Sequence, residues 1–347
     1  MRTPQRRALL PLSLVAALAL SSCGAPNSGP TPEAEQSQAA PAEKTATTRH
    51  AEGSHVPTGH VSAHLPSRDP DVLVDRKMVE HSPARDARIL TLDRAGALSR
   101  TVWALGMGEN LIGRDTASDF PGVKDLPLVT PGGHSINAET VLSLRPDIVL
   151  TDGSIGPSRV MKKLRATGVK VIDITAERTP ETIGTLIEEV AAGIGLEQAA
   201  EQVTDQINEK LDGATASAKS RADGRGMMIL YVRGTGVAMI AGPESGGRSV
   251  IQRLGGTDAG EKLGINGSFT PLTPEALIEA APDTLIIMSS GLESVGGVDG
   301  LLEVPGVSQT PAGKNRSVLD VPDSELLSFG PNTPVVIDAM AEALYGD

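Results

Sequence analysis

The sequence predicts an α/β protein of two similar lobes, in which parallel βα units are joined by one long rigid helical segment. Short apolar runs alternate with helical patterns over residues 88–173, and the alternation returns over residues 226–344. Between them, residues 179–218 read as nearly continuous helix. The pattern of residues 137–150 recurs at 273–286, where each segment is a helix that ends at Pro-Asp before a buried strand. An internal repeat of this kind favours two lobes built on one plan.

The first lobe is predicted over residues 86–178. It opens with the apolar run 88–92, which predicts a strand, and a helical pattern follows through Leu98, Val102 and Leu105. The later elements predicted here are a strand at 111–113, a helix at 138–144, a strand at 147–150, a helix at 159–166 and a strand at 169–173. This rhythm is typical of parallel strands connected by helices.

The connecting helix is predicted over residues 179–220, and the second lobe over residues 221–347. Pro180 suits the first turn of a helix, and the helical pattern then continues with a break only at 193–195. The second lobe is predicted to hold strands at 226–233 and 236–241, helices at 249–254 and 274–279, strands at 284–288 and 317–321, and a terminal helix at 334–344.

The N-terminal residues predict export and a lipid anchor. Three arginines, at positions 2, 6 and 7, precede an apolar run, 8–20, that is too short to span a bilayer. Leu20-Ser21-Ser22-Cys23 then resembles a bacterial lipobox. Residues 1–22 are therefore predicted to be a lipoprotein signal peptide, with Cys23 lipidated on the extracytoplasmic face of the cell membrane. An ordinary signal peptide with an incidental thiol is the alternative, although a free thiol is unusual in an exported protein.

Residues 23–85 are predicted to form a flexible tether between the membrane and the lobes. They are rich in Pro, Ala, Ser, Thr and Glu and show no sustained apolar periodicity. Four histidines fall in this stretch, at positions 50, 55, 60 and 64. We favour a solvated tether as their setting, and binding of a metal or haem is the alternative.

Composition narrows the partners and the chemistry. The formal net charge is −12, and removal of residues 1–22, which hold three arginines and no acids, takes it to −15. Nucleic acid is therefore excluded as a partner. Cys23 is the only cysteine, so no disulfide or thiolate metal site is expected. With two tyrosines, one tryptophan and three phenylalanines in the chain, an aromatic side chain in a binding site is conspicuous.

No catalytic motif competes with a binding role. The Gly-rich stretches 234–242 and 242–247 do not match a phosphate-binding loop, and a Gly-x-Ser-x-Gly nucleophile elbow is absent from the sequence. We expect a binding protein without enzymatic activity. A lipid-anchored hydrolase or a surface adhesin is the alternative from another class.

The order of motifs resembles the helical-backbone substrate-binding proteins of bacterial ABC importers, the class III periplasmic-binding-protein type. The motifs are GMGENLIGRD at 106–115, ETVLSLRPDIVLTDG at 139–153, LGGTDAG at 254–260 and LTPEALIEAAPDTLII at 272–287. The resemblance covers nearly all of residues 86–347. It implies a ligand held in the cleft between the lobes, delivery to an ABC permease and its ATPase, and a monomer.

Within this family the sequence is most similar to the haem-binding lipoproteins of actinobacterial haem importers (the HmuT type). The likeness lies in VTPGGHSINAETVLSLRPD at 129–147 and LYVRG at 230–234. Those proteins hold haem iron between a histidine and a tyrosine that has an arginine beside it. The resemblance implies that His134 and Tyr231 bind the iron of a transported haem b, that Arg233 assists Tyr231, and that the protein serves iron acquisition.

These residue types suit haem iron. Ferric iron accepts imidazole nitrogen and phenolate oxygen, and both occur as axial ligands of haem. Arg233 follows Tyr231 by two residues, so in a strand the two side chains share a face and the guanidinium is within reach of the phenolate. The Gly132-Gly133 pair leaves room for His134 to enter the cleft.

Several alternatives stay open from sequence. A purely structural interpretation makes His134 a solvent-facing loop residue that caps the next helix, and Tyr231 a core aromatic. The alternative cargo is a ferric siderophore or cobalamin. Tyr345 is expected to serve packing. Candidates for the walls of a haem site are Met107, Met239, Met288 and Phe329. Candidates for contact with the propionates are Arg94, Ser135, Ser289 and Ser290, and candidates for docking to the permease are Glu109, Asp119, Glu244 and Asp258.

Overall fold

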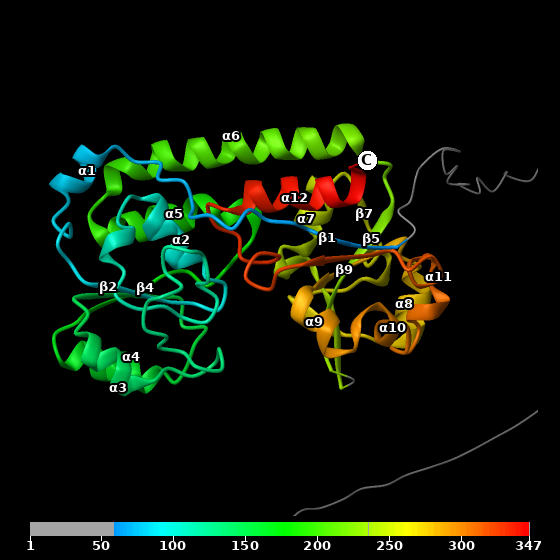
Figure 1. The fold of residues 1–347 in the computed structure, drawn as a ribbon, viewed down its shortest axis with the longest axis horizontal. Helices are drawn as coiled ribbons and strands as arrows, with labels where there is room; N and C mark the ends of the chain where they lie inside the picture. The colour runs from blue at the N-terminus through cyan, green and yellow to red at the C-terminus, as the bar shows by residue number, and fades with distance from the viewer. Residues whose placement is uncertain (1–58, 235, 347) are drawn as a thin grey trace, which may run out of the picture. The chain divides into compact units, whose positions relative to one another are not determined.

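Two α/β lobes and a helical layer that joins them make up the part of the chain that the computed structural model describes, residues 59–234 and 236–346 (Figure 1). In Figure 1, β2 and β4 lie in one lobe, β5 and β9 lie in the other, and α6 runs along both. The predicted fold class, two α/β lobes with a long connecting helix, is confirmed.

The first lobe is built on a parallel sheet of three strands in the order β2-β3-β4. The strands are β2 (Ile89–Leu92), β3 (Ile148–Thr151) and β4 (Lys170–Asp173). Its helices are α2 (Ala97–Ala104), α3 (Ala138–Leu144) and α4 (Ser158–Ala166). Every residue of β2 and β3 is buried, as their unbroken apolar runs predict.

One strand predicted for this lobe does not form. Residues 111–113 make only an isolated bridge, between Leu111 and Ile89, beside the first sheet. The pairing with Ile89 is limited to one residue, because the chain then turns away from the sheet and Arg114 forms a bridge with Leu128.

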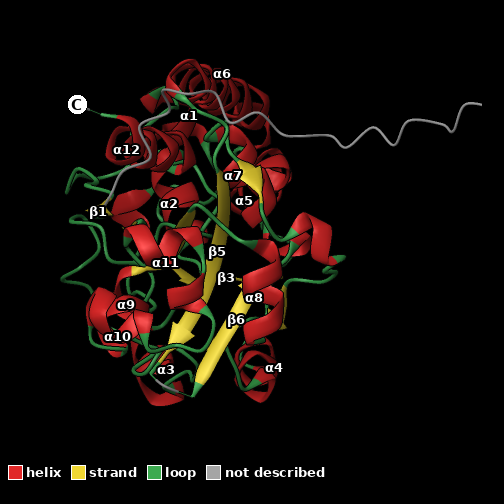
Figure 2. Cartoon of the chain, turned by 90° about the vertical axis from the view of Figure 1, so that its right-hand side faces the viewer, coloured by secondary structure: helices red, strands yellow, loops and turns green. Residues whose placement is uncertain are grey.

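The second lobe holds a mixed sheet in the order β1-β10-β9-β5-β6-β8, with β7 also paired to β5. The strands are β1 (His60–Ser62), β5 (Gly226–Arg233), β6 (Val237–Ala241), β7 (Thr257–Asp258), β8 (Phe269–Pro271), β9 (Thr284–Met288) and β10 (Val318–Val321). Strands β5, β9 and β10 are parallel, as predicted, whereas β6 is antiparallel to β5 (Figure 2). The three residues between β5 and β6 are too few for a parallel crossover, which needs a dozen or more.

Helices flank the second sheet: α7 (Gly247–Arg253), α8 (Pro274–Ala280), α9 (Ser289–Ser294), α10 (Gly297–Leu302), α11 (Pro311–Asn315) and α12 (Thr333–Tyr345). The sequence predicts α7, α8 and α12 but not the three short helices between them. Helices α9 to α11 have five or six residues each and carry several glycines, so they lack the length at which helical periodicity can be recognised.

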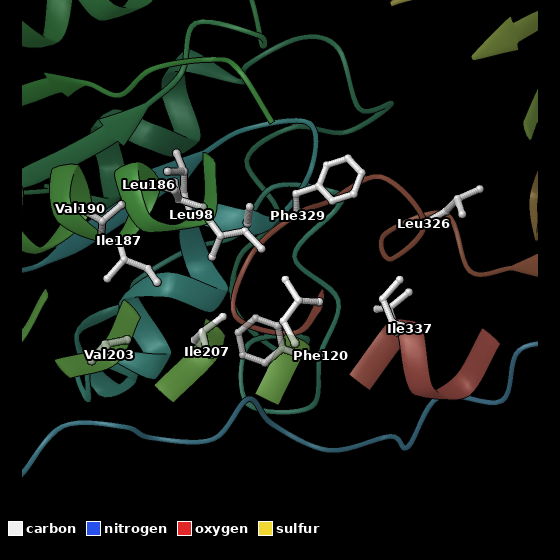
Figure 3. Close-up of a cluster of buried hydrophobic side chains, with 14 of the residues drawn as sticks. Leu98, Phe120, Leu186, Ile187, Val190, Val203, Ile207, Leu326, Phe329 and Ile337 are labelled. Atoms are coloured by element: carbon white, nitrogen blue, oxygen red, sulfur yellow. The ribbon is translucent and has the colours of Figure 1, made fainter. Parts of the chain in front are cut away.

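The connector is two helices, α5 (Ile183–Ile194) and α6 (Glu197–Arg221), and not one. The break falls at Gly195, whose φ of 71° ends α5 in the left-handed conformation. Helix α6 buries one stripe of small and aliphatic residues at helical spacing: Ala199, Ala200, Val203, Ile207, Leu211, Ala214 and Ala218. Figure 3 shows Val203 and Ile207 of α6 in one apolar cluster with residues of α5, α2 and α12. This buried cluster is continuous from one lobe to the other.

The internal repeat corresponds to a repeated structural device. Helices α3 and α8 both end at a non-glycine residue with a φ of 47°, Arg145 and Ala281, directly before Pro-Asp. The aspartate that follows then accepts a hydrogen bond from the backbone N–H at the start of the adjacent strand: Asp147 Oδ2 from Arg88 at 2.8 Å, and Asp283 Oδ2 from Gly226 at 2.8 Å. The same sequence pattern therefore fixes the register of a helix and a strand in each lobe.

The flexible tether predicted for residues 23–85 does not extend through residue 85. Residues 60–62 form β1, parallel to β10, and α1 (Arg76–His81) lies beside the first lobe. Ser82 Oγ donates to the carbonyl of Ile194 at 2.7 Å. Within residues 59–85, about half of the side chains are exposed, which is why this part of the sequence shows no sustained apolar periodicity.

The histidines of that stretch divide. His60 Nε2 lies 2.7 Å from Asp320 Oδ1, and His64 is exposed. His50, His55 and the predicted lipidation site Cys23 lie outside the described residues. None of the helices in the described ranges combines the length and the apolar character that a membrane crossing requires.

Candidate functional site

A cavity of about 520 Å³ lies between the two lobes and contains all three residues that the sequence singled out within them. His134 enters it from the first lobe, and Tyr231 and Arg233 enter from the second. The other lining residues are Asp93, Arg94, Thr116, Ala117, Asp119, Gly133, Ile155, Met239, Phe269, Met288, Asp323 and Ser324.

The strands explain why these side chains meet. Asp93 and Arg94 follow β2 directly, Tyr231 and Arg233 are among the last three residues of β5, and Met288 is the last residue of β9. These are the carboxyl ends of parallel strands, where ligand sites of α/β sheets form.

His134 sits on a loop that two glycines shape. Gly132 and Gly133 have φ values of 84° and 78°, which favour glycine, and Gly133 N donates to the carbonyl of Thr130 at 2.9 Å. The helix α3 that follows is capped by Asn137, which accepts from Thr140 N at 3.1 Å. The capping role considered for His134 therefore belongs to Asn137, and the imidazole has no hydrogen-bonding partner among the residues described.

Tyr231 is half-buried and stacked on two sides. Its ring packs edge-on against Phe269, with centroids 5.8 Å apart, and the Cζ atom of Arg233 lies 4.6 Å from its centroid. The two-residue spacing thus places Arg233 beside Tyr231, as expected. The guanidinium makes no hydrogen bond to the phenol oxygen, because it lies over the ring face and its Nη2 is bonded to Asp323 Oδ1 at 2.6 Å.

A second compartment of about 750 Å³ adjoins the first and shares five residues with it. The shared residues are Arg94, Tyr231, Phe269, Met288 and Asp323. Tyr231 and Phe269 therefore border both compartments, and together these compartments can accept a ligand wider than either alone.

The wall candidates divide between the cleft and the core. Met239 and Met288 line the cleft, as expected. Met107 and Phe329 do not, because they are 0% and 2% exposed in the core that connects the lobes. Phe269 was missed from sequence: it is 38% exposed at the start of β8, and only its rarity as an aromatic residue marked it.

The candidates for contact with the propionates differ in whether their side chains already form hydrogen bonds within the protein. Arg94 borders both compartments, and its guanidinium makes no hydrogen bond or ion pair within the described ranges, whereas its backbone N–H is bonded to Ser154 Oγ at 3.0 Å. The hydroxyls of Ser289 and Ser290 donate to Asp320 and Asp323 at 2.5 Å, and so are less available to a ligand. Ser135 is exposed outside both compartments.

The docking candidates occupy different surroundings. Asp119 borders the first cleft compartment, and Glu244 borders the second. Glu109 lies by a separate cavity of about 540 Å³ beside α1, and Asp258 is paired with Arg248 at 3.1 Å. Outside the cleft, Tyr345 donates from its hydroxyl to the Leu254 carbonyl at 2.8 Å, in keeping with the expected packing role.

Two buried carboxyl groups lie on the first-lobe side of the cleft: Asp93, which is among the lining residues, and Asp115, whose Oδ2 accepts from Asp93 N at 3.1 Å. Burial, together with the charges of Asp115 and Asp152, raises the pKa of Asp93 well above its ordinary value, and burial raises the pKa of Asp115 to about 6. Both groups carry structural bonds. Asp93 Oδ2 accepts from Ala97 N at 2.9 Å at the start of α2, and Asp115 Oδ1 accepts from Ser118 N at 2.8 Å.

Comparison with known proteins defines the class of this protein. The model of the periplasmic binding protein family (Peripla_BP_2) matches residues 95–325, and the chain belongs to that family. Its two lobes and long helix are those of the class III binding-protein fold, so the chain is a substrate-binding protein of the kind that serves importers.

Three relatives show where the chain stands within the family. The crystal structure of the haem-binding protein HmuT is similar at 35% identity and a TM-score of 0.73, covering 83% of this chain and 98% of that one. HmuT variants with alanine in place of a tyrosine, a histidine or an arginine match at the same identity. An uncharacterised ABC transporter substrate-binding lipoprotein of Bacillus subtilis, YvrC, is 24% identical over 71% of this chain and 76% of its own length. The vitamin B12-binding protein of Vibrio vulnificus strain YJ016 is 23% identical over 74% and 89%.

Proposed function

We propose that this protein captures haem between its two lobes, with His134 and Tyr231 as the axial ligands of the iron, and delivers it to an ABC permease for iron acquisition. The observation that carries the proposal is the meeting, in one cavity, of an imidazole from the first lobe, which has no hydrogen-bonding partner among the described residues, and a Tyr-Arg pair from the second. Support comes from the similarity to HmuT, a haem-binding protein that is 35% identical to this chain over nearly the whole length of HmuT.

The chemistry of the two ligands suits a ferric porphyrin. A neutral imidazole offers a nitrogen lone pair, and a phenolate is a hard anionic oxygen donor. A phenol ordinarily titrates near pH 10, so coordination at neutral pH requires the iron and a neighbouring positive charge to stabilise the anion. Arg233, stacked 4.6 Å from the Tyr231 ring centroid, supplies that charge.

The walls of the cleft suit the rest of the ligand. A porphyrin presents two broad apolar faces, and Ile155, Met239, Phe269 and Met288 are the large apolar residues around the cavity. Haem propionates are anionic, and Arg94 is the cation on the wall whose guanidinium has no partner within the described part of the chain. We assign Arg94 as the first propionate contact to test.

Anchoring and delivery complete the proposal. A lipidated Cys23 would hold the protein on the outer face of the cell membrane, with the predicted tether between the anchor and the lobes. The transported ligand is haem b, the protein acts as a monomer without catalysis, and carboxylates on the two lobes meet the permease. The match to an ABC transporter lipoprotein supports this setting.

The test is a haemin titration of the purified protein followed by its absorption spectrum. Wild type should show a saturable one-to-one Soret band, and His134→Ala and Tyr231→Ala should each shift the band and release haem faster. His64→Ala is the control for the imidazole, which it removes outside the cleft, and Tyr345→Phe is a control that removes a phenol hydroxyl outside the cleft. If both ligand variants kept the wild-type spectrum, the assignment of the iron ligands would be wrong.

Cobalamin is the second candidate cargo, because a vitamin B12-binding protein is among the relatives. Its lower identity, 23% against 35% for HmuT, places it behind haem. Calorimetric titration with cyanocobalamin separates the two: heat of binding with cobalamin and no Soret change with haemin would replace haem by cobalamin and leave the fold assignment intact. A ferric siderophore, the other alternative cargo, is tested in the same way.

A further inference from the structure

We infer that Asp323 is a positioning residue of the cleft, which holds the guanidinium of Arg233 over the ring of Tyr231. Asp323 lies on the segment between β10 and α12 and borders both compartments. The inference rests on the proposed role of Tyr231 as an iron ligand, and it adds the residue that sets the position of the charge beside that ligand.

Arg233 is the last residue of β5, and about a third of its side chain is exposed, so packing alone does not fix the position of its guanidinium. Its strongest contact is the 2.6 Å ion pair from Nη2 to Asp323 Oδ1. Its other hydrogen bonds are a 2.9 Å bond from Nη1 to the carbonyl of Val232 and a 3.9 Å contact from Nη2 to the sulfur of Met288. A thioether is a weak acceptor, so without Asp323 the guanidinium would keep the carbonyl bond and its contact with the Tyr231 ring, on a long side chain that retains considerable rotamer freedom.

Asp323 is itself held firmly enough to act as an anchor. Its Oδ2 accepts from Ser290 N at 2.9 Å, and its Oδ1 accepts from Ser290 Oγ at 2.5 Å. Both oxygens are thereby tied to the start of α9. Charge-assisted bonds of this kind are short and directional, so the carboxylate has one favoured orientation toward Arg233.

The backbone of α9 is also shaped to admit Arg233. A Cβ atom placed on Gly291 would lie 2.8 Å from Arg233 Nη1 and 2.8 Å from the carbonyl oxygen of Val232. Glycine at this position therefore leaves the space that the guanidinium occupies. Ser290, Gly291 and Asp323 together form a seat for Arg233, and the seat points its charge at the Tyr231 ring.

Charge and geometry make opposite predictions for Asp323, which allows a test. As an anion, Asp323 partly neutralises Arg233 and so reduces the stabilisation of a phenolate. As an anchor, it keeps the positive charge 4.6 Å from the ring centroid, and Coulomb interactions weaken with distance. We propose that the anchoring effect dominates, because a guanidinium released into solvent would lose most of its influence to water.

The variants are Asp323→Ala, Asp323→Asn, Ser290→Ala, Arg233→Ala and the double variant Arg233→Ala/Asp323→Ala. Asparagine keeps an oxygen that can accept from Arg233 but loses the negative charge, and Ser290→Ala removes one support of Asp323 while leaving the ion pair. The haem readouts are the Soret position and the rate of haem transfer to apomyoglobin. A readout without haem is the ring-current shift of the Arg233 Nε–H resonance in ¹⁵N-arginine-labelled protein, assigned from its absence in Arg233→Ala.

We expect Asp323→Ala to reproduce the spectrum of Arg233→Ala, with haem release faster by about tenfold. Asp323→Asn should restore the wild-type spectrum, and Asp323→Ala should add nothing in the Arg233→Ala background, because the two residues act through one contact. The ring-current shift should disappear in Asp323→Ala and persist in Asp323→Asn and Ser290→Ala.

Two results would overturn the inference: a wild-type ring-current shift in Asp323→Ala, or an equal effect of Asp323→Ala with and without Arg233. Failure of the proposed function looks different, because wild type would then give no Soret band while the resonance of Arg233 still reported its position. Thermal unfolding of each variant identifies any loss that comes from a loosened α9.

Discussion

The buried ion pair between Arg100 and Glu325 provides the sharpest test of how the lobes are held. Arg100 lies on α2 of the first lobe, and Glu325 lies on the segment between β10 and α12 that leads back from the second sheet. Their Nη2 and Oε1 atoms are 2.6 Å apart, and the side chains are 3% and 10% exposed. Replacement of Glu325 by alanine would leave the guanidinium buried, with Asp119 at 3.5 Å as its one remaining charged partner in the described part of the chain.

The expected loss follows from burial. Removal of one partner of a buried pair costs about 3–5 kcal/mol, and the remaining contact with the half-exposed Asp119 places the cost near the lower end, at about 3 kcal/mol. For a domain of this size that corresponds to a fall in Tm of roughly 6–12 °C. The surface pair of Arg165 and Asp173 is a matched control: its atoms are also 2.6 Å apart, but the side chains are 40% and 77% exposed, so Arg165→Ala should cost less than about 1 kcal/mol.

The pKa of Glu325 adds a second expectation. Burial raises this pKa despite the attraction of Arg100 and a hydrogen bond from Asn332, so desolvation outweighs the Coulomb gain. The double variant Arg100→Met/Glu325→Leu should therefore recover most of the stability that Glu325→Ala loses. Urea denaturation followed by circular dichroism measures these three variants together with the single replacements Arg100→Met and Glu325→Leu. A loss below about 1 kcal/mol for Glu325→Ala, or a double variant as unstable as the sum of two single losses, would refute the reasoning.

Three further predictions concern one buried acid and two glycines. Because the pKa of Asp115 is raised to about 6 from 3.8, the folded state keeps a proton that the unfolded chain has released. The stability from this group is therefore full below about pH 4 and is lost as the pH rises through 6. Asp115→Asn should reduce the slope of Tm against pH in that window, and an unchanged slope would contradict the prediction. Gly213 lies on the exposed side of α6 with open space around its Cβ position, so Gly213→Ala should raise stability by about 0.5–1 kcal/mol, and a drop in Tm would show that α6 is strained there. Gly132, by contrast, has a φ of 84° with open space around its Cβ position, so Gly132→Ala should cost about 1 kcal/mol through the backbone alone. The change should also displace His134, which would be seen as a weaker Soret band. A wild-type band would show that the loop tolerates the change.

Much of the fold was predictable because its signals are local. Buried parallel strands read as unbroken apolar runs, and the Pro-Asp that follows α3 and α8 repeats in the sequence because it performs the same capping and register function in each lobe. What failed lacked such a signal. Strand β1 has three residues in a polar segment and is a strand only because the edge of β10 is there to pair with it.

The candidate site divides in the same way. His134, Tyr231 and Arg233 were found from a motif and a two-residue spacing, which are properties of the chain order. Phe269, Asp323 and Ser324 come from segments that lie far from those motifs in the sequence, and nothing in their neighbourhood marks them. The assignments of Met107 and Phe329 were wrong because an apolar residue suits a core and a ligand wall equally, and its sequence does not say which it faces.

The amino-acid sequence by itself determined the alternation of strands and helices, the repeat of the two lobes and the residue types available for a ligand, because each depends on neighbours along the chain. Only the tertiary structure decided that the guanidinium of Arg233 lies over the ring of Tyr231 and is bonded to Asp323, a residue 90 positions away. It also decided that β6 folds back antiparallel and that Arg100 and Glu325 connect the two lobes. These outcomes depend on which surfaces meet when the apolar faces are buried, and that packing brings together side chains whose separation along the chain carries no signal.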